Sequence, residues 1–267
     1  MVFHKMILTK LFNIVILLLV FAKQIRADEY TVLIDPGHGG EDNGATAIVG
    51  ERVINKKKFA DYVFEKNFTL EISQLVQAKL KDKKYKAYLT RSFDRTVTLQ
   101  ERAAMAEKLN PDLIISIHIN SSESKASHGI ETYYLDNHSD LVVKKVEEIE
   151  NKNLTGEDLV VQQIIIDLVI ERTGKSSQRL SNFVHNEIIK KIGRNYKMTD
   201  RGARPGLFYV LALSKRPGIL LEAGFMSNPE ELAKMSSKKF KDDYANAIVA
   251  GIDRYFFGGP SSSLPLL

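Results

Sequence analysis

Four side chains able to bind or assist a metal ion stand where apolar segments of this sequence begin or end. His38 lies in the glycine-rich stretch after the apolar residues 32–34, and His118 interrupts the apolar run LIISIHI. Glu65 continues the apolar stripe of a predicted helix toward its N-terminus, and Glu222 ends another short apolar run. Two imidazoles and a carboxylate form a donor set that binds catalytic zinc and leaves one position open for water.

Each of these residues also has a purely structural interpretation when it is taken alone. His118 can be a core histidine with satisfied hydrogen bonds, and Glu65 can complement the dipole of its helix. Glu222 can be an ordinary glutamate at the end of a strand. A carboxylate that points inward is nevertheless costly unless it is paired or binds a cation. Four such residues in comparable positions favour a functional site.

The stretch TVLIDPGHGGEDNGA, which contains His38, allows three interpretations: a tight turn, a phosphate-binding loop or half of a metal site. It lacks the G-x-x-x-x-G-K-[ST] pattern of a P-loop and the spacing G-x-G-x-x-G, so phosphate binding loses its main support. The chain contains no G-x-S-x-G motif, the mark of one class of serine nucleophile. It also contains no cysteine, which excludes a thiol nucleophile. A metal site must therefore use His, Asp and Glu, and a structural turn remains the alternative for this loop.

The elements that must position these residues follow an α/β pattern, because apolar runs alternate with segments of helical period. Strands are predicted at residues 32–34, 85–90, 113–119, 129–135, 207–213 and 219–221. Helices are predicted at residues 68–80, 99–109, 141–150, 159–171, 181–192, 229–235 and 242–255. Ligands of open α/β sheets gather at the carboxyl ends of strands, so we expect both histidines and Glu222 at one sheet edge.

The two ends of the chain differ from the rest. Lys5 and Lys10 precede an apolar run at residues 11–22 that is shorter than the ~20 residues of a spanning helix. Residues 1–27 are therefore predicted to be a secretory signal peptide, with an uncleaved N-terminal anchor as the alternative. Without their four basic residues the formal charge falls from +5 to +1, which gives no electrostatic argument for nucleic-acid binding. Residues 28–258 are predicted to form one domain, and residues 259–267 a disordered tail.

Several separated motifs resemble one family. They are LIDPGHGG, Glu65-Lys66-Asn67, TRSFDRTVTLQERAAMAEKLNPDLIISIHINS, GIETYYL and ILLEAGFMSNPEE. In this order, over about residues 31–256, they resemble the zinc-dependent N-acetylmuramoyl-L-alanine amidases (the amidase_3 family). The resemblance implies a three-layer α/β sandwich with a mixed, largely parallel central sheet flanked by helices.

The same resemblance implies a site and a reaction. The zinc ligands would be His38, Glu65 and His118, and Glu222 would be the catalytic carboxylate. The implied reaction is hydrolysis of the amide between the lactyl group of N-acetylmuramic acid and the L-alanine of the stem peptide, in cell-wall remodelling or daughter-cell separation. Ala223 stands where the family commonly has a larger apolar residue or threonine, a change that we expect to be harmless.

Residues 140–175 loosely resemble a helical insertion found in the cell-division branch of this family. There the segment blocks the active site until an activator protein displaces it. Glu147, Glu148 and Glu150 are the candidates for a blocking carboxylate here. The expected partners are thus peptidoglycan and an activator, with no nucleic acid; we expect a monomer that is exported, to the periplasm.

Two rival functions remain at this point. The first is another zinc hydrolase that cuts a peptide bond, and the second is a noncatalytic wall-binding module, which the presence of both Glu65 and Glu222 disfavours. Other candidate residues are expected to be structural or solvated. Structural roles are expected for Arg91, Arg95 and Arg102, and solvated positions for His128, His138 and His185.

Overall fold

The computed structural model describes residues 29–54, 57–151 and 159–258. The predicted signal peptide and C-terminal tail lie outside the described residues. A six-stranded sheet has the strand order β4-β1-β5-β8-β6-β7, and a separate two-stranded ribbon pairs β2 with β3. The strands are β1 (Thr31–Pro36), β2 (Thr46–Ile54), β3 (Lys57–Phe64), β4 (Lys86–Leu89), β5 (Leu113–Asn120), β6 (Ile130–Leu135), β7 (Asp200–Gly206) and β8 (Gly218–Phe225).

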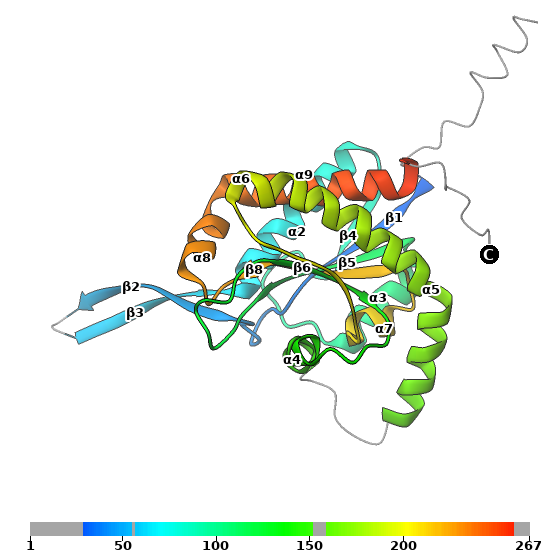
Figure 1. The fold of residues 1–267 in the computed structure, drawn as a ribbon, viewed down its shortest axis with the longest axis horizontal. Helices are drawn as coiled ribbons and strands as arrows, with labels where there is room; N and C mark the ends of the chain where they lie inside the picture. Colours follow the sequence, from blue (N-terminus) through cyan, green and yellow to red (C-terminus); the bar gives the residue numbers. More distant parts are fainter. Residues whose placement is uncertain (1–28, 55–56, 152–158, 259–267) are drawn as a thin grey trace, which may run out of the picture.

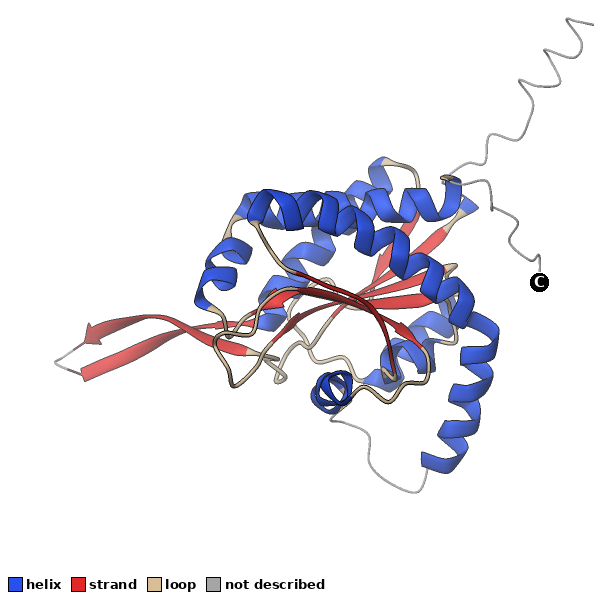
Figure 2. Cartoon of the chain, viewed as in Figure 1, coloured by secondary structure: helices blue, strands red, loops and turns tan. Residues whose placement is uncertain are grey.

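The sheet is mixed and largely parallel, as predicted. All its neighbouring strands run parallel except β6 and β8, which pair antiparallel. Helices cover both faces of the sheet, so the domain has three layers (Figures 1 and 2). The helices are α2 (Glu65–Asp82), α3 (Leu99–Leu109), α4 (Leu141–Glu150), α5 (Leu159–Ile188), α6 (Arg194–Tyr196), α7 (Tyr209–Ser214), α8 (Pro229–Ser236) and α9 (Lys238–Phe257), with a π-helical turn, η2 (Ile189–Gly193), between α5 and α6.

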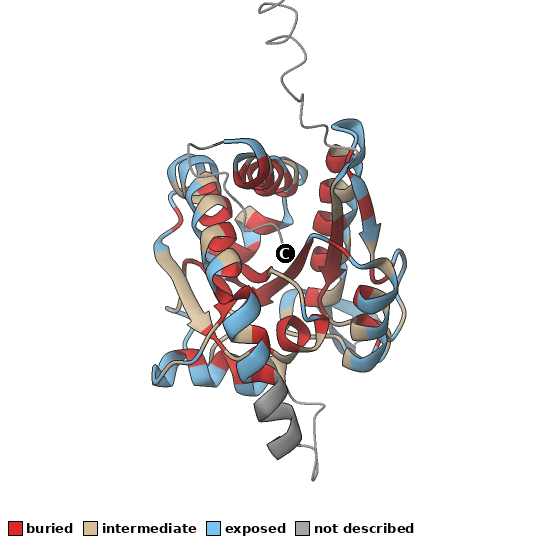
Figure 3. Ribbon diagram, turned by 90° about the vertical axis from the view of Figure 1, so that its right-hand side faces the viewer, coloured by how far each residue is buried: buried red, intermediate tan, exposed pale blue. Residues whose placement is uncertain are grey.

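Two buried clusters fill the spaces between the layers, because successive side chains of a strand point to opposite faces. On β5, Ile115 joins the cluster formed with α2, α5 and α9, whereas Ile114 joins the cluster that includes α3, α4 and α7. Figure 3 shows this burial along the strands and on the inward faces of the helices. The continuous apolar run of β5 is thus buried on both faces, as a central parallel strand requires.

Several sequence predictions need correction. The apolar residues 207–213 were predicted as a strand, but helix α7 begins at Tyr209. The prediction failed because a short apolar run fits a buried strand and a buried helix equally well. The strand nearby is β7, whose sequence DRGARPG has little β-propensity and lies at the sheet edge, where proline is tolerated. The helix predicted at 159–171 and most of the one predicted at 181–192 belong to one continuous helix, α5, that ends at Ile188; residues 189–192 lie in η2.

The segment from residue 140 does not cover a single face. Val143 and Val146 of α4 pack in the cluster shared with α3 and α7, while Leu180 and Val184 of α5 pack in the opposite cluster. The ribbon β2–β3 was also not predicted, and it projects from the body of the domain (Figures 1 and 2). No helix of the described part is long and apolar enough to cross a membrane.

Candidate metal centre

The loop after β1 holds His38 in a backbone conformation that few side chains adopt. The φ angle of His38 is 58°, in the left-handed region. A Cβ atom on Gly37 would lie 2.5 Å from the ring of His118, and one on Gly44 would lie 2.5 Å from both Glu65 and the His38 ring. These two glycines therefore allow the imidazoles and the carboxylate to approach one another.

Asp42 fixes the orientation of the His38 ring. Its Oδ2 lies 2.8 Å from Nδ1 of His38, and its Oδ1 accepts a hydrogen bond from the Gly44 N–H at 3.0 Å. A carboxylate on one ring nitrogen fixes the tautomer of a metal-binding histidine and directs the other nitrogen. The remaining nitrogen of His38, Nε2, thus faces the interior of the cluster.

Glu65 is the first residue of α2 and is buried, with 1% of its surface exposed. Its Oε2 accepts a hydrogen bond from the Ala45 N–H at 2.8 Å, and its Oε1 accepts one from the Ile119 N–H at 2.8 Å. The carboxylate is therefore held by backbone groups of two separate segments. Its Oε1 also lies 3.1 Å from Nε2 of His38 and 3.4 Å from Nδ1 of His118.

His118 and Glu222 stand side by side in the sheet. The parallel register of β5 and β8 pairs His118 with Glu222, and the antiparallel register of β8 and β6 pairs Glu222 with Glu131. Paired residues of neighbouring strands share one face. Glu222 is fully buried, and neither of its oxygens has a hydrogen-bond partner among the described residues. A buried carboxylate without partners is the kind of group that needs a functional explanation.

Glu150, the last residue of α4, joins this cluster. Its Oε2 lies 2.8 Å from Nδ1 of His118 and 3.6 Å from Nε2 of His38. Glu147 anchors the same helix by accepting hydrogen bonds from the Leu207 N–H and pairing with His138. Asp140 caps the helix by accepting a hydrogen bond from the Val142 N–H.

These four residues can hold a cation. One ligand atom from each of His38, Glu65, His118 and Glu150 lies within 4.8 Å of the other three. Nε2 of His38 and Nδ1 of His118 are buried, and each faces carboxylate oxygens of Glu65 and Glu150 at 2.8–3.6 Å. Nitrogen and carboxylate donors in a four-membered set fit Zn²⁺, which prefers tetrahedral coordination. The donor chemistry and the convergence of imidazole nitrogens and carboxylate oxygens thus both fit a metal site.

The charges of the cluster shift the pKa values of its members. Burial alone would lower the pKa of His38 and of His118, but nearby carboxylates outweigh it and raise both to about 10. For Glu222, burial raises the pKa well above its usual range, and the charges of Glu150 and Glu65 raise it further. Protons therefore balance the carboxylates in the protein alone, and a divalent cation would replace them.

A second buried network supports the loop that carries His38. Asp35 accepts hydrogen bonds from the Thr90 and Ser116 hydroxyls at 2.6 and 2.8 Å and forms an ion pair with Arg102. Arg102 also donates to the carbonyl oxygen of His38 at 2.9 Å. Arg91 donates to the carbonyl oxygens of Pro36 and Gly37. The structural roles expected for Arg91 and Arg102 are confirmed.

The structure brings together the sequence-predicted residues His38, Glu65 and His118, and it places Glu222 beside His118. Of the three acidic candidates on α4, Glu150 reaches the cluster. Sequence reasoning missed Asp42 and Asp35, although both lie within four positions of His38. Their signal was an acidic residue next to a candidate ligand, which alone does not separate an orienting carboxylate from a surface one.

Two of the other histidines are not solvated, contrary to the prediction. The His138 side chain is 5% exposed and pairs with Glu147, and His185 is buried between Thr132 and Asp200. His128 is exposed, as predicted.

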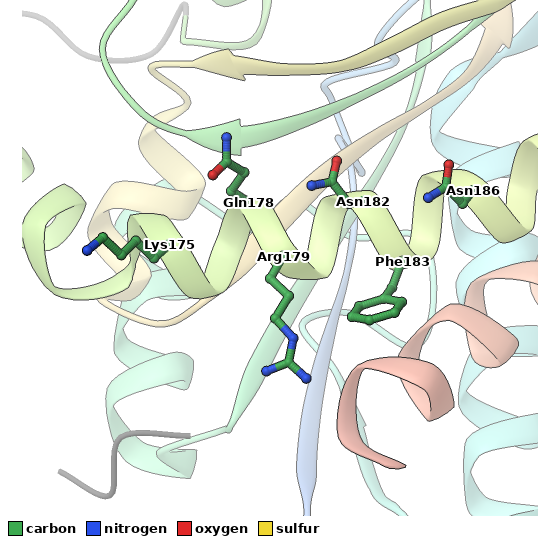
Figure 4. Close-up of a pocket in the computed structure, with 6 residues that line it drawn as sticks. All are labelled: Lys175, Gln178, Arg179, Asn182, Phe183 and Asn186. Carbon is green, nitrogen blue, oxygen red and sulfur yellow. The ribbon is translucent and has the colours of Figure 1, made fainter. Parts of the chain in front are cut away.

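A separate pocket lies along α5 (Figure 4). Its lining contains none of the ligand residues and consists of Lys175, Gln178, Arg179, Asn182, Phe183 and Asn186. Figure 4 shows these side chains leaving the helix in different directions, with no carboxylate or imidazole among them. We therefore assign the chemistry to the metal cluster.

Comparison with known proteins agrees with this assignment. Residues 32–254 match the family Amidase_3, described as N-acetylmuramoyl-L-alanine amidase. The chain is 32% identical to N-acetylmuramoyl-L-alanine amidase AmiA of Escherichia coli, covering 84% of this chain and 75% of that protein. It is 31% identical to the uncharacterised protein YqiI of Bacillus subtilis, covering 85% and 84%. The solved amidase AmiC2 of Nostoc punctiforme superposes with a TM-score of 0.62 at 30% identity, covering 85% of this chain and 97% of that one.

Proposed function

Because this chain belongs to the N-acetylmuramoyl-L-alanine amidase family, we propose that it cleaves peptidoglycan with a zinc ion held by His38, Glu65 and His118. The bond cut is the amide between the lactyl group of N-acetylmuramic acid and the L-alanine of the stem peptide. The convergence of four ligand atoms within 4.8 Å, two of them buried imidazole nitrogens that face carboxylate oxygens, is the observation that supports the metal site most strongly.

Hydrolysis of an unactivated amide requires an activated water for the attack and a proton for the departing amine. Bound zinc lowers the pKa of water to about 7 and polarises a carbonyl oxygen. Asp42 orients one of the two histidines for this ion through a hydrogen-bond distance of 2.8 Å. The backbone N–H groups of Ala45 and Ile119 hold both oxygens of Glu65 in place. The protein thus supplies a preformed donor set.

Glu222 is the proposed general base and acid. It stands beside His118 in the sheet, it is fully buried, and both of its oxygens are free of partners in the described structure. It would accept a proton from the attacking water and deliver it to the departing amine of L-alanine.

Mass spectrometry of digested peptidoglycan tests this activity. Purified peptidoglycan incubated with the protein should yield free stem peptides that begin with L-alanine, together with intact glycan strands. A zinc chelator should abolish the products, and added zinc should restore them. Shortened stem peptides that remain attached to the glycan would instead indicate the rival activity, a zinc hydrolase that cuts a peptide bond.

We further propose that α4 is a regulatory element that holds the site closed. Glu150 occupies the position next to both histidines that an incoming water and substrate carbonyl would need. Leu141 and Val142 of the same helix are 74% and 49% exposed, although they are large apolar side chains. Displacement of α4 by an activator protein would remove Glu150 and open the site. Of the rest of the predicted insertion at residues 140–175, residues 152–158 lie outside the described residues and residues 159–175 form the first part of α5.

The substrate sets the proposed location. Peptidoglycan lies outside the cytoplasmic membrane, so an enzyme that cuts it must be exported, which agrees with the signal peptide predicted at residues 1–27. We propose a periplasmic monomer. N-terminal sequencing of the exported protein determines whether residues 1–27 are retained or removed in the mature protein.

A further inference from the structure

The ribbon formed by β2 and β3 projects from the domain and carries large apolar side chains in solvent (Figures 1 and 2). Ile48 is 61% exposed, Tyr62 is 54% exposed and Phe59 is 46% exposed. An isolated two-stranded ribbon is marginally stable in water, and exposed apolar surface that is retained at this cost commonly marks a binding site.

The register of the ribbon separates two faces. Thr46 pairs with Phe64, and Ile48 pairs with Tyr62, so these four side chains share one face near the base of the ribbon. The rings of Tyr62 and Phe64 are nearly parallel, with an interplanar angle of 9° and a centroid separation of 6.4 Å. We call this set of four residues the ribbon platform. Phe59 pairs with Arg52 and lies on the opposite face.

The ribbon platform is continuous with the metal centre. Phe64 directly precedes the proposed ligand Glu65, whose carboxylate accepts a hydrogen bond from the N–H of Ala45, the residue just before β2. The Nζ of Lys66 lies 5.8 Å from the centre of the Phe64 ring and donates to the carbonyl oxygen of Gly40 at 2.6 Å. The loop that carries His38 and the base of the ribbon are therefore joined by one lysine side chain.

The platform itself carries no formal charge, and two of the three basic residues in the described part of the ribbon are paired, whereas Lys57 at the far end is exposed without an ion pair there. Lys58 pairs with Glu51 at 3.3 Å, and Arg52 pairs with Asp61 at 3.0 Å. The four platform residues therefore offer no cation to the carboxylates of a stem peptide. An uncharged pair of aromatic rings instead matches a sugar ring, whose polarised C–H groups are attracted to the negative face of an aromatic ring.

We propose that the ribbon platform binds the glycan strand of peptidoglycan next to the muramic acid whose amide is cut. The glycan continues beyond that sugar in both directions, so a bound strand must cross surface outside the metal centre. Tyr62 and Phe64 stack on sugar rings, and the Thr46 hydroxyl is placed to bond a sugar hydroxyl or acetamido group. This inference rests on the proposed function, because it takes the metal centre at Glu65 as the place of cleavage.

Binding of soluble glycan strands from which the stem peptides have been removed tests the inference. The full chain is compared with Tyr62→Ala/Phe64→Ala and with Phe59→Ala, a matched aromatic control on the opposite face. Titration calorimetry should give a dissociation constant about tenfold larger for the double variant, because each aromatic contact contributes modestly. The control should bind as the unmodified chain does. On intact peptidoglycan, the double variant should raise KM and leave kcat unchanged.

These strands lack the amide between the lactyl group and L-alanine, so the binding result does not depend on zinc or on Glu222. If the proposed cleavage mechanism is wrong, the double variant should still bind these strands more weakly than the unmodified chain does. Equal dissociation constants for the double variant and the unmodified chain would overturn the proposal that the ribbon platform binds glycan. Circular dichroism and the melting temperature establish whether each variant is folded. If the double variant is not folded, the single variant Tyr62→Ala replaces it in the binding test. A dimer in sedimentation that the double variant dissociates would assign the face to a second copy and likewise overturn the proposal.

Discussion

The loop behind His38 and the helix that carries Glu150 reach the same cluster but are held very differently. Behind His38, Asp35 is 1% exposed, receives two hydroxyl hydrogen bonds and pairs with Arg102, which in turn binds the carbonyl oxygen of His38. Helix α4 is anchored by two buried valines, by Glu147 and by the Asn151 side chain, which bonds the backbone of Leu207.

The difference suggests a division between permanent and removable ligands. The buried network contains charges that become costly if one partner leaves, so it fixes the histidine loop in one arrangement. The contacts of α4 are fewer, and Leu141, Val142 and Ile149 are exposed on it. Segments with few buried apolar contacts open at lower free energy than the core. The four predictions that follow test whether the two regions separate in this way.

The largest effect is expected at Glu222. Replacement by glutamine removes the group that accepts and returns the proton, so kcat should fall by about 10²–10⁴. Zinc binding and the melting temperature should stay close to those of the unmodified chain, because Glu222 is not among the four ligand-forming residues. Activity is measured by release of stem peptides from peptidoglycan. Near-normal turnover in Glu222→Gln would remove Glu222 from the mechanism.

The permanent region should lose stability when its buried ion pair is broken. Arg102→Met leaves the Asp35 carboxylate buried without its cation, at a cost of about 3–5 kcal/mol in the free energy of unfolding. Denaturant unfolding measures this cost. Arg254→Met is the matched control, because Arg254 pairs with Glu187 on the surface and should matter by at most ~1 kcal/mol. Equal losses in the two variants would contradict a special role for the buried network.

Helix α4, the removable region, should give a gain of activity when its contact with the site is removed. Glu150→Ala should raise activity on purified peptidoglycan about tenfold without any activator, since apparent activity scales with the open fraction. Deletion of residues 142–158 should act in the same direction. Glu148→Ala is the matched control, because Glu148 is exposed on the same helix. Unchanged or lost activity in folded Glu150→Ala protein would show that α4 does not restrain the site.

The smallest expected effect is on the pH dependence of the free energy of unfolding. Burial raises the pKa of Asp35, but Arg102 and the hydrogen bonds from Thr90 and Ser116 outweigh it and lower the pKa below its usual value. This contribution to stability is present above the unfolded pKa of about 3.9 and is lost as the pH falls further. The stability difference between the unmodified chain and Arg102→Met should therefore narrow below about pH 4. A constant difference between pH 3 and pH 7 would exclude the link.

The clustering of the candidate site was largely predictable because its proposed ligands lie at the ends of strongly apolar elements. The run around His118 was predicted as a buried strand and forms β5, and the carboxyl ends of neighbouring parallel strands meet at one edge. Glu150 was one of three acidic candidates on one helix. Choosing among them required the rotation of α4 about its axis, which is set by the packing of Val143 and Val146.

The missed elements lack the burial pattern on which the prediction depends. The ribbon β2–β3 exposes side chains on both faces, so its sequence does not alternate between apolar and polar residues as a half-buried strand does. Edge strand β7 contains two glycines and a proline and is identified only by its partner β6. In both cases the pairing is set by tertiary context, which local propensity does not contain.

Zinc affinity, measured by competition with a chromophoric chelator, tests the central claim most directly. The unmodified chain should bind one zinc ion, His118→Ala should lose it, and Glu150→Ala should keep it. That result would show that His38, Glu65 and His118 are sufficient ligands and that the fourth carboxylate is removable. Retention of zinc by His118→Ala, or its loss from Glu150→Ala to the same extent, would contradict this account of the site.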